Sequence, residues 1–233
     1  MTENRNLLYC DLGVIDYKEA WDLQQETLEL RREGKIPDVI YLLEHPNTYT
    51  LGKTSDKTHL IGSRDYLLAN NISVYDIDRG GDITYHGPGQ IVGYPIIDLS
   101  DWKKDTHKYL RSLEETILRT CGDYGITAGR EPKYTGVWVD DRKIAAIGIK
   151  VSRWITMHGF AFNVNTDLSF FSGIIPCGIS DKDVTSLSRE INEQVDLAKV
   201  KMELVKHFVD IFGYANVNQV TKEKIFSVNF ISA

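Results

Sequence analysis

Apolar and polar residues alternate in several stretches of the chain, which predicts β-strands. The stretches are LLYCDLG (7–13), DVIYLLEH (38–45), TYTLGK (48–53), ISVYDID (72–78), DITYH (82–86) and QIVGYPIIDL (90–99). HPN, RGG and GPG separate some of these stretches as turns. Residues 136–165 are typical of a hairpin with DDR as its turn, followed by further strands. Alternation near Ile225–Ile231 predicts a closing strand.

Four other segments have the length and apolar spacing of helices. Asp16 is the expected N-cap of a helix over residues 17–35, with Glu19 as its capping-box partner. A short helix is expected over 63–71 and a last one over 197–214. The helix expected over 106–125 places four residues on one apolar face: Leu110, Leu113, Ile117 and Cys121. Because the strands cluster instead of alternating with helices, the pattern favours an α+β fold.

Composition and charge limit the classes of function. The chain has 233 residues, 42% hydrophobic and 26% charged, with a net charge of −6. This acidic balance argues against nucleic acid as the main partner. The N-terminus lacks the apolar stretch of a signal peptide, and no segment approaches the roughly 20 apolar residues of a membrane helix. We expect a cytoplasmic protein without a membrane contact. With no repeat or linker, residues 1–233 are expected to form one domain.

The chain has three cysteines. In a cytoplasmic protein we do not expect them to form a disulfide framework, and without a CxxC spacing they do not indicate a structural zinc site. Cys10 and Cys121 lie on apolar faces of a strand and a helix, so we expect both in the core. Cys177 lies in GIIPCGISDKDVTSL, bounded by proline and glycine. It is either a buried thiol or a nucleophile, and a nucleophile needs a neighbouring cation to lower its pKa. Candidates for that neighbour are His86, His158 and Lys143.

The segment RGGDITYHGPGQIVGYPIIDL holds five glycines around two expected strands. It lacks the P-loop spacing and does not open a helix, so a phosphate or dinucleotide site is not indicated. Tight hairpin turns would explain most of the glycines. They explain less well the polar residues Arg79, Tyr85, His86 and Gln90 among them. Polar groups in a glycine-walled cleft favour a site for a small acyl or carboxylate ligand.

Taken together, four segments resemble the octanoyltransferase family of lipoate biosynthesis, usually called LipB. They are LLEHPNTYTLGK, RGGDITYHGPGQIVGYPIIDL, KIAAIGIKVSRWITMHGFAFNVN and IIPCGISDKDVTSL, and they cover most of residues 40–187. REPKYTGVWVD is a looser match. The resemblance implies the class II synthetase-like fold of lipoate– and biotin–protein ligases, with a mixed sheet flanked by helices.

The resemblance also implies an activity and its residues. Members transfer octanoyl from acyl carrier protein to a lysine of lipoyl domains, in 2-oxoacid dehydrogenases and in the H protein of glycine cleavage. They need no ATP, metal or other cofactor, because the thioester is already activated. The catalytic pair falls on Lys143 and Cys177. The substrate-binding segments fall on Arg79, Gly80, Gly81, Asp82, Ile83, Thr84, Tyr85, His86, Ala146, Ile147, Gly148, Gly159, Phe160 and Ala161.

The chemistry of these residue types agrees with the resemblance. A cysteine thiolate can attack a thioester to give an acyl-enzyme, and a lysine can carry the proton. Backbone N–H groups near Gly148 or Gly178 could hold the oxyanion. Two alternatives remain at this point: an ATP-dependent lipoate–protein ligase, which needs no thiol, and a non-catalytic acyl-binding module. For docking of an acidic carrier protein, we expect a basic patch that draws on Lys150, Arg153 and Lys182.

Overall fold

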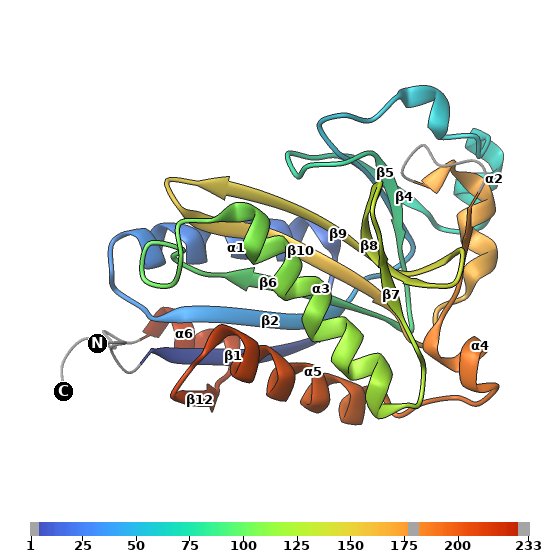
Figure 1. Cartoon of the computed structure of the whole chain (residues 1–233). Helices are drawn as coiled ribbons and strands as arrows, with labels where there is room; N and C mark the ends of the chain where they lie inside the picture. The colour runs from blue at the N-terminus through green and yellow to red at the C-terminus, as the bar shows by residue number, and fades with distance from the viewer. Residues whose placement is uncertain (1–4, 177–181, 228–233) are drawn as a thin grey trace.

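The structure, a computed structural model, describes residues 5–176 and 182–227 (Figure 1). Its helices are α1 Tyr17–Arg32, α2 Arg64–Ala69, α3 Thr106–Asp123, α4 Leu187–Ile191, α5 Leu197–Phe212 and α6 Lys222–Ser227, with 3₁₀ turns η1 Lys57–His59 and η2 Leu168–Gly173. Its strands are β1 Asn6–Val14, β2 Asp38–Glu44, β3 Thr48–Leu51, β4 Ser73–Asp76, β5 Ile83–His86, β6 Gln90–Ile96, β7 Gly129–Glu131, β8 Tyr134–Val139, β9 Arg142–Ser152, β10 Ile155–Asn163, β11 Asp183–Val184 and β12 Asn216–Gln219.

The strands form two sheets. The larger has the order β12-β1-β2-β6-β10-β9-β8-β7, with β11 added to β9, and the smaller has the order β4-β3-β5. In the larger sheet β12, β1 and β2 are parallel, whereas β2, β6, β10, β9 and β8 run antiparallel. This mixed sheet with helices around it confirms the expected α+β class. That residues 1–233 form one domain stays a prediction.

Helices cover both faces of the larger sheet, and each face has its own core. In Figure 1, α3 and α5 lie in front of the sheet, and α1 lies behind it. The front core joins Leu113 and Ile117 of α3 to Phe208 of α5 and to apolar strand residues. The rear core joins Ala20 and Leu23 of α1 to the alternate residues of the same strands. Adjacent strand residues point to opposite faces, so one strand supplies both cores.

Two details of the predicted helices change. Asp16 caps α1 by accepting a hydrogen bond from the Lys18 N–H, but the Glu19 carboxylate pairs with Lys222 and does not complete a capping box. In α3 the buried positions include Tyr109, while Leu110 is half-buried. The predicted face is therefore rotated by about one residue at the start of α3, because Leu110 faces a cavity described below.

The end of the described chain differs from the prediction. Residues 225–227 belong to helix α6, so the closing strand is wrong there; the rest of that predicted strand lies outside the described residues. A helix lets Ile225 and Phe226 both pack on the rear core, whereas strand alternation would direct one of them away. Strand β12 was missed because its four residues are exposed and show no apolar alternation.

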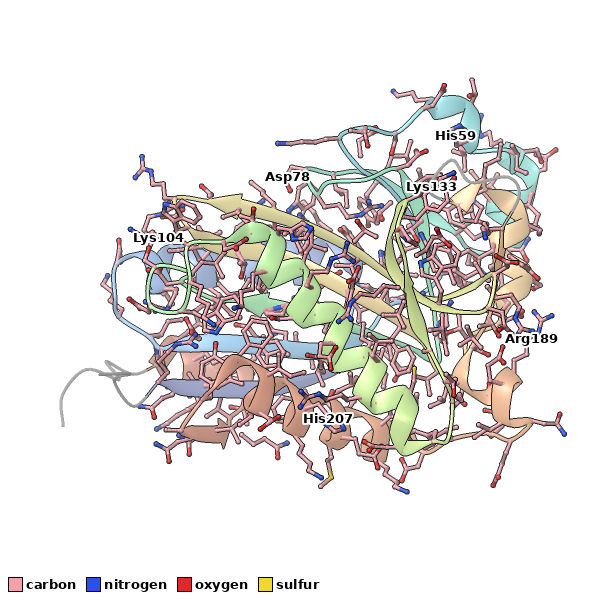
Figure 2. All side chains as sticks on the ribbon, in the orientation of Figure 1. His59, Asp78, Lys104, Lys133, Arg189 and His207 are labelled. Carbon is pink, nitrogen blue, oxygen red and sulfur yellow. The ribbon has the colours of Figure 1, made fainter. Side chains whose placement is uncertain are left out.

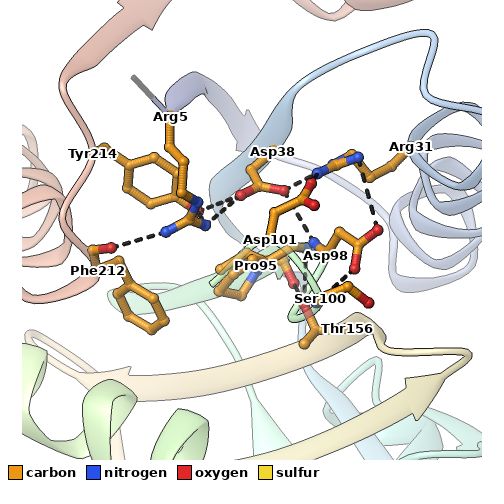
Figure 3. A network of polar contacts seen from close by, with 11 residues as sticks. Arg5, Arg31, Asp38, Pro95, Asp98, Ser100, Asp101, Thr156, Phe212 and Tyr214 are labelled. Atoms are coloured by element: carbon orange, nitrogen blue, oxygen red, sulfur yellow. Dashed lines mark hydrogen bonds and ion pairs between the residues drawn. The ribbon is translucent and has the colours of Figure 1, made fainter. Parts of the chain in front are cut away.

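One buried carboxylate joins five parts of the chain (Figure 3). Asp38, at the start of β2, is 3% exposed. Its two oxygens accept hydrogen bonds from Arg5 Nη2 at 2.6 Å, Arg31 Nε at 2.8 Å and the Tyr214 hydroxyl at 2.8 Å. The backbone N–H of Asp98 adds a fourth bond, at 3.0 Å. The carboxylate thus fixes α1, the segment after β6 and the segment after α5 to the edge of the sheet.

Within the part of the chain that the structure describes, no helix has the combined length and apolarity needed to cross a membrane.

Removing the carboxylate of Asp38 should destabilise the fold strongly. We expect Asp38→Ala to lower the free energy of unfolding by about 3 kcal/mol or more, because two largely buried guanidinium groups lose a shared partner. Asp22→Ala is the matched control. Its ion pair with Lys18 is about half exposed on each side (56% and 55%), so its loss should cost under about 1 kcal/mol. Urea titration measures both values, and similar losses would contradict the role given to Asp38.

Candidate functional site

A cavity of about 500 Å³ lies between the larger sheet, the smaller sheet and the start of α3. Strands β9 and β10 and the loop after β4 form most of its wall. The residues around it are Tyr17, Thr54, Arg79, Gly80, Gly81, Asp82, Thr84, His86, Tyr94, Leu110, Lys133, Tyr134, Thr135, Lys143, Ala146, Ile147, Gly148, Ile149, His158, Gly159, Phe160 and Ala161. Fourteen of the residues named from the sequence as site candidates, His158 among them, therefore meet around one space.

Small residues on adjacent strands leave room for the cavity. Ala146 pairs with Ala161 across the β9–β10 ladder, and Gly148 pairs with Gly159. The loop from Arg79 to Gly81 lies directly on this part of β9: the Gly80 N–H donates to the Ile149 carbonyl at 3.0 Å. A Cβ at Gly148 would lie 2.9 Å from the Gly80 carbonyl oxygen. Glycine is therefore required at position 148 for the two backbones to approach this closely.

Arg79 is buried, and its guanidinium holds the loop to the smaller sheet. Its Nη2 donates to the Thr50 carbonyl at 2.8 Å and to the Thr50 hydroxyl at 3.0 Å, and its Nη1 donates to the Gly80 carbonyl at 3.0 Å. The guanidinium thus fixes the cavity wall, with its charge close to the space where a ligand would lie.

Strand β5 divides its predicted site residues between two environments. Thr84 and His86 face the cavity. Ile83 and Tyr85 point the other way, into a separate core with Tyr49 and Phe171. Strand alternation makes this division unavoidable, so the run of neighbouring residues 83–86 cannot all face one ligand.

Two buried histidines, His86 and His158, line the cavity, a third, His45, lies against His86 with ring centres 5.6 Å apart, and burial lowers the pKa of each. The pKa of His45 falls to about 4, and that of His86 lies well below its usual 6.5. His158 has a left-handed backbone (φ 59°), and its Nε2 lies 2.8 Å from the carboxylate of Asp78. That histidine and Lys150 in turn hold the pKa of Asp78 well below its usual value. All three rings are therefore neutral near pH 7, and the two that line the cavity can orient a ligand without adding charge.

Lys143, the second residue of β9, reaches the cavity from a largely buried position. It is 7% exposed. Its Nζ lies 4.8 Å from the centre of the Trp138 ring on the neighbouring strand β8, within the range of a cation–π contact. The methylene groups of the same side chain pass close to Gly136, where a Cβ would lie 3.4 Å from Cε. The local packing therefore holds the amine in a defined direction, unlike a lysine in a solvated turn.

Cys177 lies outside the described residues, as does Gly178, but the described residues on both sides of that gap lie near Lys143. Pro176 and Lys143 line the same small void of about 10 Å³. After the gap, β11 pairs in parallel with β9 so that Val184 is opposite Lys143. The Thr185 N–H also donates to the Lys143 carbonyl at 3.0 Å.

The other two cysteines are in the cores, as predicted. Cys10 and Cys121 are both buried. Burial raises the pKa of Cys10 to about 11 and that of Cys121 to about 12. Both thiols are therefore protonated at neutral pH and unsuited to nucleophilic attack.

The expected basic patch is largely neutralised. Lys150 forms an ion pair with Asp78, and Lys182 forms one with Asp141. Arg153 lies in the turn between β9 and β10, at the opposite end of β9 from Lys143. Lys133, labelled in Figure 2, borders the cavity directly and was not among the predicted charges.

Sequence reasoning missed several residues around the cavity. They are Tyr17, Thr54, Tyr94, Leu110, Lys133, Tyr134, Thr135 and Ile149. Tyr17 and Leu110 lie on helices whose apolar patterns place them in a core, and nothing in that pattern separates a cavity wall from a core. Tyr134 lies in the loosely matching segment REPKYTGVWVD, in which no residue stands out as a site candidate.

Three comparisons relate this chain to known proteins. Residues 16–209 match the family described as the lipoyl protein ligase A/B catalytic domain. An octanoyltransferase from Christiangramia forsetii is 51% identical over 226 residues, which cover 90% of this chain and 97% of that relative.

Solved structures share the fold at low identity. Lipoate-protein ligase A bound with ATP has a TM-score of 0.73 and 15% identity, covering 96% of this chain and 92% of that one. A bi-partite lipoate protein ligase from Thermoplasma acidophilum has a TM-score of 0.72 and 17% identity, covering 97% and 91%. These likenesses confirm the fold expected from the sequence.

A side chain at Gly148 should separate the loop from β9. We expect Gly148→Ala to lower the free energy of unfolding by about 1–3 kcal/mol, because the added Cβ meets backbone that cannot rotate away. Gly122→Ala in α3 is the control, since nothing lies within 4 Å of its Cβ position, and it should be neutral or stabilise by up to about 1 kcal/mol. Denaturant titration measures both. Equal stability of Gly148→Ala and the parent protein would show that the loop does not need the close approach.

The neutral histidines should make the fold sensitive to mild acid. His45 has a folded-state pKa of about 4 against its usual 6.5, so as the pH falls the unfolded chain takes up this proton first. Stability is then lost between about pH 6.5 and pH 4. His45→Gln cannot titrate, and its unfolding free energy should fall less steeply, by up to about 1.4 kcal/mol per pH unit. Parallel curves for the two proteins between pH 7.5 and 5 would contradict this role of His45.

Proposed function

The chain belongs to the lipoyl protein ligase A/B catalytic family, and within it to the octanoyltransferases, and we propose from this that it carries octanoyl from acyl carrier protein to a lysine side chain. It is an acyltransferase of lipoate biosynthesis. The proposed acceptors are lipoyl domains of 2-oxoacid dehydrogenases and of the glycine cleavage H protein. In support, the Thermoplasma ligase with the same fold is described together with its E2 lipoyl domain.

The proposed catalytic pair is Cys177 and Lys143. The observation that carries this proposal is the position of the described residues just before 177 and just after 181. Pro176 shares a void with Lys143, and Val184 pairs with Lys143 in the β-ladder. Both described flanks of Cys177 therefore lie close to Lys143, which supports pairing the thiol with this amine. Burial of Cys10 and Cys121 leaves Cys177 as the cysteine available for this chemistry.

The proposed reaction has two steps that balance without a further reagent. The Cys177 thiolate attacks the carbonyl of octanoyl-carrier thioester, an S–C bond forms, and the carrier thiolate leaves with a proton from Lys143. The neutral Lys143 amine then takes a proton from the acceptor lysine as that amine attacks the new thioester. An amide forms, and Cys177 returns as a thiolate beside an ammonium group. The ammonium favours the thiolate by lowering the pKa of the thiol.

The cavity wall suits an acyl chain along β9 and β10. Ala146, Gly148, Gly159 and Ala161 present little more than backbone, so a chain can lie against the strands. Phe160, Ile147 and Leu110 add apolar surface nearby. The proposed path of the chain starts at Lys143 and follows β9 towards His158. Arg79 and the Gly80–Asp82 loop would cover it from the side of the smaller sheet.

An acyl-enzyme should form on Cys177 and nowhere else. Incubation with octanoyl-carrier protein, followed by intact-mass and peptide analysis, should place one octanoyl group on Cys177 without ATP. Cys177→Ala should lose both the acyl-enzyme and turnover. Cys10→Ala and Cys121→Ala should keep the chemistry and lose about 1 kcal/mol of stability each. Acylation that requires ATP would instead favour a ligase, and full turnover by Cys177→Ala would exclude the proposed nucleophile.

Lys143→Ala should retain the thiol but react slowly. Near neutral pH a thiol without a neighbouring cation is only a few per cent thiolate, because its pKa is about 8.5. We expect a loss of roughly 10²-fold or more in the rate of acyl-enzyme formation, partly recovered as the pH rises towards that value. A matched change at Lys206, an exposed lysine of α5, should have no effect. An unchanged rate in Lys143→Ala at pH 7 would remove Lys143 from the mechanism.

A further inference from the structure

The four residues before Cys177 are held by a segment from a distant part of the chain. The Gly173 carbonyl accepts hydrogen bonds from the N–H groups of Ile61 and Gly62, at 3.1 and 2.8 Å. Leu60 and Ile174 form an antiparallel bridge. The Ile175 N–H donates to the carbonyl of His59 at 2.8 Å. The bond from Ile175 to His59 is therefore the last of these described backbone contacts, and Ile175 lies two residues before the proposed nucleophile.

The side chain of the same residue reaches the cavity wall. His59 Nδ1 lies 2.5 Å from one carboxylate oxygen of Asp82. The other oxygen accepts from the N–H of Ile83 at 2.7 Å, which fixes the carboxylate at the start of β5. Asp82 borders the cavity next to Gly80 and Gly81. His59 thus connects two parts of the chain. Its ring contacts Asp82 in the loop that lies over the cavity, and its carbonyl accepts from Ile175 in the segment that leads into Cys177.

The turn that holds His59 has little packing of its own. The 3₁₀ turn Lys57–His59 has no buried residue, so apolar burial contributes little to its position. Asp56 caps the turn through the Thr58 N–H at 2.8 Å, which shapes the turn but leaves its placement open. Leu60, next in the chain, packs on the core of the smaller sheet and pairs with Ile174, and the two contacts of His59 add the connection to Asp82 and Ile175. In a position set mainly by polar contacts, the loss of one contact moves the backbone more readily than it would in a core.

We propose that His59 is a positioning residue that couples occupancy of the cavity to the placement of the segment Gly173–Pro176. This inference rests on the proposed function, since it concerns how the nucleophile of that reaction is brought to its substrate. A ligand that shifts the Arg79–Asp82 loop moves the Asp82 carboxylate with it. That carboxylate fixes the imidazole, and the His59 carbonyl then fixes the Ile175 N–H. The coupling changes the position of the thiol relative to the acyl group and leaves the intrinsic reactivity of the thiol unchanged.

The test compares two reactions of Cys177 in His59→Ala. Single-turnover acylation by octanoyl-carrier protein at saturating concentration should be slower by about tenfold, in the middle of the range for coupling between contacting groups. The concentration of octanoyl-carrier protein at half saturation should change by no more than about twofold. The rate of alkylation of Cys177 by iodoacetamide should also change by no more than about twofold, because neither quantity depends strongly on how the thiol is aligned with the acyl group. An equal fall in acylation and alkylation would overturn the proposal, since it would indicate a general loss of structure.

A conservative variant and a double-mutant cycle keep the test independent of folding. The amide of His59→Asn can donate from near the position of Nδ1, so we expect it to recover most of the acylation rate, whereas His59→Gln should not. If the pair acts as a unit, Asp82→Ala combined with His59→Ala should be no slower than the slower single variant. Fully additive losses, or no rescue by asparagine, would overturn the proposal.

The chain offers a matched control pair. His207 Nε2 lies 2.6 Å from the carboxylate of Asp123, a contact of the same type between α5 and α3. Figure 2 shows His59 beside the smaller sheet and His207 on α5, on opposite sides of the molecule. His207→Ala should leave acylation and alkylation unchanged. Unchanged acylation in His59→Ala would overturn this inference alone, whereas acylation of the parent protein at a residue other than Cys177 would overturn the proposed function.

Discussion

The close approach of the Arg79–Gly81 loop to strand β9 is the constraint on which the site depends. At Gly148 and Gly52 the space beside the backbone is occupied by the loop itself: a Cβ would lie 2.9 Å from the Gly80 carbonyl oxygen in one case and 2.2 Å from the Gly81 carbonyl oxygen in the other. Since neither glycine has a side chain, the loop comes close enough for its backbone hydrogen bonds to join the smaller sheet to the larger one. The space that remains beside this junction is the cavity.

The same junction sets the electrostatics of the site. It buries histidines and an arginine, and each of them needs polar partners to offset lost hydration. His86 Nδ1 lies 2.9 Å from the Gln90 amide oxygen, and Gln90 donates to the Asn163 amide oxygen at 2.9 Å. Asn163 in turn donates to the Thr185 carbonyl at 3.0 Å. A polar chain thus runs from the closed side of the cavity to the segment that follows β11. Together with the contacts of His59, it connects the cavity to the chain on both sides of the proposed nucleophile.

Most elements follow from local pattern, and the exceptions have identifiable causes. The helix over Thr106–Asp123 and the paired strands Arg142–Ser152 and Ile155–Asn163 were predictable, because their apolar spacing matches one period over many residues. Strand β12 was not, since it is exposed and owes its form to pairing with β1. The alternation near Ile225 predicts a strand, but the segment forms helix α6. In so short a segment the local β-propensity is weaker than the packing of Ile225 and Phe226 on the rear core.

For the site, the sequence by itself determined the chemistry: a thiol between proline and glycine, a lysine after a turn, and a glycine-rich segment with arginine and histidine. Residue types and their order in family motifs carry that information without coordinates. Only the tertiary structure decided which of these residues meet. It directed Ile83 and Tyr85 away from the cavity, because alternate residues of a strand face opposite sides. It brought Tyr17, Leu110 and Tyr134 to the cavity, and it set His59 between Asp82 and Ile175. Such contacts join residues tens of positions apart, and they depend on how sheets and loops pack, which no local pattern specifies.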